Sequence, residues 1–164
     1  MAAPSPRSGT RIRHNRRRIG VVAAAGLALV VAPGVLALGA TVTRGEISAF
    51  ATGTGLPTMG RAQMIRTADG KTTVTVHVEG LSPNTKYGSH VHQLPCATSE
   101  ADGHYKNDPA GPATPPNEIW PGFTTNEAGV GNGYATVGWT AGATAVSVVV
   151  HAPGGAKIAC ADLE

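Results

Sequence analysis

An alternation of valine with polar residues is the feature that most restricts the fold of this chain. Within residues 72–79, valine stands at positions 74, 76 and 78, and polar residues stand between them. This period of two places the valines on one face of a β-strand, and the preceding Asp69-Gly70 pair is typical of a hairpin turn. No segment after residue 40 has the period of an amphipathic helix, and the chain holds 22 Gly and 12 Pro. We therefore predict an all-β sandwich or barrel.

Several other segments have the composition of short strands. A long proline-rich stretch, residues 94–121, has no periodic pattern, and a loop of this length inside a compact domain is usually functional. In addition to the alternating segment, strands are predicted at residues 61–67, 86–93, 131–140, 145–151 and 157–160.

The first forty residues have the composition of an export signal. They contain six arginines and no acidic residue, and the uncharged run Ile19–Leu38 ends among small residues at Ala37 and Gly39. We predict a cleaved signal peptide over residues 1–40, with a loose fit to a twin-arginine signal at Arg16-Arg17. The alternative is an uncleaved N-terminal membrane anchor, because the uncharged run is long enough to span a bilayer. In both cases the remaining chain is exported, either secreted or anchored facing outside.

The exported part divides into a predicted flexible linker, residues 41–60, with at most one frayed strand, and a β-domain, residues 61–164. After residue 40 the chain has seven Lys and Arg and all ten Asp and Glu, which gives a formal charge of −3. The basic character of the whole chain therefore belongs to the leader, and no nucleic-acid partner is expected. The two cysteines, Cys96 and Cys160, are expected to form one disulfide outside the cytoplasm. The alternative is a pair of buried free thiols.

Four histidines of the β-domain form a candidate metal site. His90 and His92 stand two residues apart on a predicted strand, so both imidazoles point to the same face. His104 lies in the long loop, and His151 ends a mostly apolar run that is expected to form a buried strand. Four imidazoles suit copper, zinc or nickel. His77 lies opposite the valine face of its strand, and we expect it to face solvent.

The sequence around these histidines resembles the copper/zinc superoxide dismutases. Gly88-Ser89-His90-Val91-His92 is similar to the Gly-Phe-His-Val-His stretch that carries two copper ligands in that family. The other similar segments, in the order and spacing of the family, are Val76–Pro83 before the metal site, Cys96 at the first disulfide cysteine, Gly103–Asn107 around the bridging histidine, Val148–His151 at the fourth copper ligand and Gly154–Cys160 at the C-terminal glycine-rich signature.

The resemblance implies an immunoglobulin-like Greek-key β-barrel and dismutation of superoxide to dioxygen and hydrogen peroxide. It implies copper bound by four histidines, with a proton-carrying role for His104. Lys157 stands where the family has an arginine that holds the substrate anion; the lysine keeps the charge but loses the planar fork. The implied copper ligands are His90, His92, His104 and His151, and the implied disulfide joins Cys96 to Cys160.

The chain departs from the family pattern at the residues that bind zinc in the family. No histidine lies between His104 and His151, and Ile119 occupies the position of the family's zinc-binding aspartate. Only Ala152-Pro153 remains of the charged loop that precedes the glycine-rich signature. The chain therefore resembles the copper-only branch of the family, and we do not expect it to bind zinc. Without zinc, His104 needs another partner for its far nitrogen, for which Glu118 and Asp108 are the candidates.

Two other functions remain open from the sequence. The same histidines suit an exported protein that stores or carries copper without turnover. A metal-free β-sandwich acting as an adhesion or scaffold module is the third interpretation. The sequence does not indicate an oligomeric state.

Overall fold

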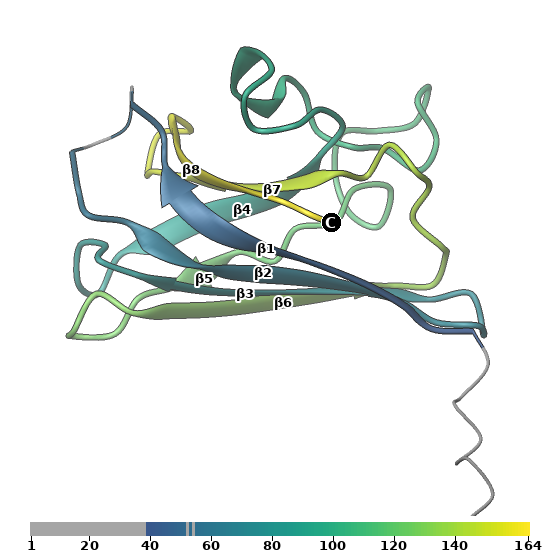
Figure 1. Ribbon diagram of the computed structural model, residues 1–164, viewed down its shortest axis with the longest axis horizontal. Coiled ribbons are helices and arrows are strands. Elements are labelled where there is room, and N and C mark those ends of the chain that lie inside the picture. The colour runs from purple at the N-terminus through teal and green to yellow at the C-terminus, as the bar shows by residue number, and fades with distance from the viewer. Residues whose placement is uncertain (1–38, 52, 54) are drawn as a thin grey trace, which may run out of the picture. The chain divides into compact units, whose positions relative to one another are not determined.

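The computed structural model describes residues 39–164 except 52 and 54. The predicted leader therefore lies outside the described residues, apart from Gly39 and Ala40. None of the described residues forms a helix with the length and apolarity that a bilayer crossing requires. The elements are β1 (Thr41–Ala49), β2 (Met59–Arg66), β3 (Thr72–Glu79), β4 (Lys86–His92), the short 3-10 helix η1 (Ser99–Ala101), β5 (Phe123–Thr124), β6 (Gly131–Val137), β7 (Ser147–His151) and β8 (Lys157–Asp162) (Figure 1).

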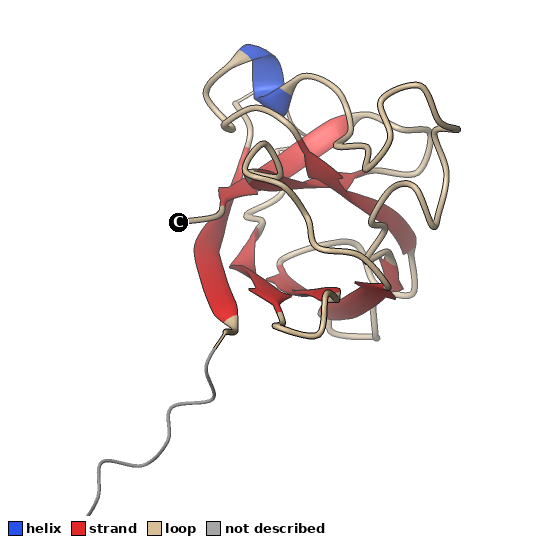
Figure 2. Ribbon diagram, turned by 90° about the vertical axis from the view of Figure 1, so that its right-hand side faces the viewer, coloured by secondary structure: helices blue, strands red, loops and turns tan. Residues whose placement is uncertain are grey.

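The eight strands form one antiparallel sheet, which confirms the all-β prediction. The strand order is β5-β4-β7-β8-β1-β2-β3-β6. Strands β4 and β7, β8 and β1, and β3 and β6 are neighbours without being consecutive, as Greek-key connections produce. The end strands β5 and β6 also lie in contact, so the sheet curves into a nearly closed barrel (Figure 2).

The predicted alternation of β3 sets the inner face of the barrel. Val74, Val76 and Val78 are buried, and the residues between them are not. The β2–β3 hairpin turns through the predicted Asp69-Gly70 pair, where Gly70 has a φ of 82° that suits glycine. The apolar interior is continued by Met64 from β2 and by Val148 and Val150 of β7.

The prediction of a flexible linker at residues 41–60 is wrong. Strand β1 pairs with β2 from Thr41 to Ser48 and also pairs with β8, so it lies inside the sheet. Only Ile47 of β1 is buried, and this explains why hydrophobic alternation does not reveal the strand. Gly45 allows the close pairing with β8, since a Cβ there would lie 1.8 Å from the carbonyl oxygen of Asp162. The β-domain therefore begins near Thr41 and not at Arg61.

The disulfide between Cys96 and Cys160 is confirmed. It joins the loop that follows β4 to the middle of β8. A hydrogen bond of 2.7 Å from the Cys96 amide to Asp162 Oδ1 adds a second link between the same segments. The start of the long loop is therefore fixed against the barrel wall, which positions the residues after it.

Candidate metal centre

Two neighbouring strands carry three of the four histidines. His90 and His92 alternate along β4, so they share the face of the strand that points away from the buried Val91. His151 ends β7 and pairs with Gly88 of β4. Residues that face each other in an antiparallel pair point to the same side, so His151 joins the face of His90 and His92.

The fourth histidine comes from the long loop, which runs along the edge of β4 beyond its short pairing with β5. The amide of Tyr105 donates to the carbonyl of Val91 at 2.8 Å, and the amide of Gln93 donates to the carbonyl of Gly103 at 3.2 Å. These bonds pair His104 with His92 in an isolated antiparallel bridge and hold His104 beside the strand.

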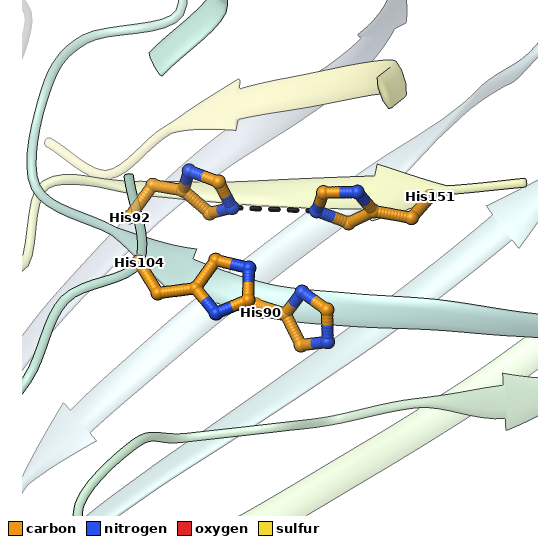
Figure 3. A group of neighbouring side chains, drawn as sticks. All are labelled: His90, His92, His104 and His151. Atoms are coloured by element: carbon orange, nitrogen blue, oxygen red, sulfur yellow. Dashed lines mark hydrogen bonds between the residues drawn. The ribbon is translucent and has the colours of Figure 1, made fainter. Parts of the chain in front are cut away.

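The four imidazoles converge on one point, as the sequence predicted (Figure 3). One nitrogen from each ring lies within 4.8 Å of the corresponding nitrogens of the others. The Nε2 atoms of His92 and His151 are 3.3 Å apart. His77 lies outside the cluster, on the outer face of β3, where its ring contacts Asn132 and Glu79.

Hydrogen bonds fix the tautomers of three of these rings. The Nδ1 atoms of His92 and His151 lie 3.0 Å from the carbonyl oxygens of Asp102 and Gly155, respectively. A carbonyl only accepts, so each Nδ1 carries the proton and each Nε2 presents a lone pair to the centre. His104 Nδ1 likewise donates its proton to the Glu118 carboxylate, so its Nε2 also presents a lone pair to the centre.

Two observations indicate that a cation fits this centre. The lone pairs of His92 and His151 face each other, which is unfavourable without a proton or a metal ion between them. His90 Nδ1 is buried and has no hydrogen-bond partner among the described residues. A metal bound by three Nε2 atoms and one Nδ1 atom would satisfy all four rings.

Three of the rings, those of His90, His92 and His151, are held in the neutral form that binds metals. Burial, together with the neighbouring histidines, lowers the pKa of His90 and of His92 to about 3. Burial also lowers the pKa of His151. At neutral pH these rings therefore offer lone pairs and not positive charges.

Of the two predicted candidates, Glu118 is the hydrogen-bond partner of His104. Its side chain is 1% exposed, and Oε2 accepts a hydrogen bond of 2.7 Å from His104 Nδ1. The same oxygen accepts a bond of 2.7 Å from Trp120 Nε1. Asp108, the other candidate, instead accepts from the amide of Ala110 in a local turn.

Trp120 is a residue of the site that the sequence analysis did not identify. Its ring centroid lies 4.9 Å from that of His90, and it covers one side of the cluster. The only signal in the sequence is its position two residues after Glu118, which in an extended segment puts both side chains on one side.

Lys157 lies next to the cluster at the start of β8, where it pairs with His151. Its Nζ donates hydrogen bonds of 2.8 Å to the carbonyl oxygens of Glu100 and Asp102. The Asp102 carbonyl is also the acceptor for His92. Lys157 therefore supports the loop that orients a histidine, and its positive charge lies close to the centre.

A cavity of about 410 Å³ opens onto the cluster. Three of the four histidines line it, and His92 lies deeper in the protein. The other lining residues are Lys86, Gly88, Ala152, Pro153, Gly154 and Gly155.

Comparison with models of known protein families gives no match to this chain, and a search of curated proteins gives none either.

Proposed function

We propose that this chain is an exported superoxide dismutase that uses copper bound by His90, His92, His104 and His151. The observation that carries the proposal is the convergence of four imidazoles, three of them with their far nitrogens already bonded. Copper has the highest affinity of the common divalent metals for nitrogen ligands. When bound, it supplies the one-electron couple that oxidises one superoxide to dioxygen and reduces another to peroxide.

His104 is the proton carrier in this proposal. It is the one ligand that comes from a loop, and its side chain is 28% exposed. Its Nε2 takes up a proton and gives it to the peroxide, while Nδ1 remains bonded to Glu118. The carboxylate stabilises the imidazolium form and keeps the ring aimed at the centre. Two superoxide anions and two protons thus yield one dioxygen and one hydrogen peroxide.

Lys157 is proposed to hold the substrate anion beside the centre. Its two bonds to backbone carbonyls fix the position of its charge without neutralising it. We also propose that the chain binds no second metal at His104, because Glu118 occupies the nitrogen that would face a zinc ion. The disulfide fits the oxidising conditions outside the cytoplasm that the predicted leader implies.

The test is the dismutase rate of the copper-loaded protein, with the zinc-loaded and metal-free proteins as controls. We expect a rate well above that of the controls in the copper form alone, and a loss of that rate in His104→Ala. Stoichiometric copper without a rate above the controls would contradict the proposal and favour the copper-carrier function.

A further inference from the structure

The outward face of β4 connects the metal centre to a second lysine. Lys86, Gly88 and His90 alternate along the strand, so they share the face that carries the cluster. Lys86 is exposed, and it lines both the cavity that opens onto the histidines and a neighbouring one beside Trp120. Lys86 is therefore at the mouth of the metal centre.

Gly88 keeps the strand surface between Lys86 and the cluster open. A Cβ at this position would lie 3.5 Å from His151 Cβ and 3.6 Å from His90 Cε1, which are ordinary contact distances. The backbone does not require glycine there, since the φ of Gly88 is outside the left-handed region. The missing side chain leaves a shallow path toward the ring of His90 and the side chain of His151.

The charges at this mouth favour an anion. No acidic residue is among the described residues that line the cavity, and Lys86 is the single lysine or arginine there. Lys86 forms no ion pair with any acidic residue in the part of the chain that the structure describes. The domain after residue 40 has a formal charge of −3, so an anion approaching from elsewhere meets net repulsion.

We propose that Lys86 guides small anions to the metal centre along the open surface at Gly88. The proposal rests on the proposed function, in which superoxide is the anion. Lys157 lies at the start of β8 and is bonded to the loop that carries Glu100 and Asp102. Lys86 lies on β4 and places its positive charge at the entrance of the cavity. The two lysines therefore have separable roles, one in holding the anion and the other in its approach.

The test uses the copper-loaded full protein and azide as a probe anion. Azide binding is followed by the absorption change at the copper, which does not depend on turnover. The variants are Lys86→Ala, Lys86→Arg and Gly88→Ala. The matched control is Lys71→Ala, which removes the same charge from an exposed hairpin residue outside the cavity. Copper content and thermal stability are measured for each variant.

We expect Lys86→Ala to weaken azide binding about twofold to fivefold at low salt, with Lys86→Arg near the wild type. The dismutase rate of Lys86→Ala should fall by a similar factor, and its salt dependence should flatten. Gly88→Ala should reduce azide binding with copper content retained. Equal azide binding in Lys86→Ala and Lys71→Ala would overturn the proposal.

The outcomes separate this inference from the proposed function. If azide binding depends on Lys86 but the wild type has no dismutase rate, the guiding role stands and the dismutase proposal fails. If the wild type is active and neither its rate nor its azide affinity changes in Lys86→Ala, the guiding role is wrong and the dismutase proposal stands.

Discussion

The histidines bear on stability as well as on metal binding. In the folded, metal-free protein the pKa of His90 and of His92 is lowered from 6.5 to about 3. The unfolded chain therefore binds more protons than the folded chain between these pH values. By linkage, the stability contributed by these groups is complete above pH 6.5 and is lost as the pH falls toward 3.

We predict that the free energy of unfolding of the metal-free protein decreases over this pH range. Denaturant unfolding at a series of pH values measures it. His90→Asn, which removes one of the two strongly shifted groups, should show a smaller decrease. A free energy of unfolding that stays constant from pH 6.5 to pH 3 would contradict the burial of neutral rings.

Glu118 offers a test of how His104 is positioned. Glu118→Gln keeps the shape of the side chain and removes its charge, so the bond to His104 Nδ1 is no longer charge-assisted. We predict a rate about tenfold lower, equivalent to roughly 1.4 kcal/mol, with copper content retained. The exposed Glu127→Gln is the control. An unchanged rate in Glu118→Gln would show that the carboxylate does not support the proton transfer.

Lys157 is expected to affect anion capture near the copper. Salt screens exposed charges over about 8 Å at physiological ionic strength, so the attraction by this charge should weaken as salt rises. We predict that Lys157→Ala lowers the dismutase rate and flattens or reverses its salt dependence, whereas Lys157→Arg is tolerated. Stopped-flow rates over a salt series measure this. An unchanged rate in Lys157→Ala, with copper content intact, would remove Lys157 from the mechanism.

At the scale of elements, the strands with clear alternation were predictable and β1 was not. The face of β3 follows from its valines, and the positions of β4, β6, β7 and β8 agree with the predicted segments to within a few residues. Strand β1 is stabilised by backbone pairing on both sides, and its side chains give no period-two signal. The two-residue strand β5 is too short to produce any pattern.

The same contrast applies to the site. The pair on β4 could be predicted from the period of a strand, whereas His104 and His151 were grouped with it through the resemblance of the short motifs. The pairing of β4 with β7, which brings His151 to the same face, is visible only in the fold. The contact between Trp120 and His90 could not be predicted, since it depends on the path of the loop between β4 and β5. The sequence offered Glu118 and Asp108 as hydrogen-bond partners for His104, and only the fold shows that Glu118 is the partner.

The disulfide connects this loop to the barrel and supports a prediction of its own. The cysteines are 64 residues apart, so their removal costs on the order of 4 kcal/mol in the chain-entropy model. The loop also carries the Asp102 carbonyl and His104, so copper should dissociate more readily. We predict both effects in the double variant Cys96→Ser/Cys160→Ser, measured by denaturant unfolding and by copper competition. A free energy of unfolding within about 1 kcal/mol of the wild type would contradict this role.

For the whole molecule, the described domain combines a barrel, one disulfide and one histidine cluster. Its negative formal charge is unfavourable for capturing an anion, so the placement of individual lysines becomes decisive. The disulfide is compatible with the oxidising compartment to which the predicted leader would direct the chain. These features are compatible with the proposed function, a small exported enzyme whose activity would depend on one metal ion.

The most direct test is the copper and zinc content of the exported protein, measured by elemental analysis with the dismutase rate of the same sample. The account predicts about one copper per chain, no stoichiometric zinc, and a rate that scales with copper content. A tightly bound zinc alongside the copper, or a rate that does not follow the copper content, would contradict it.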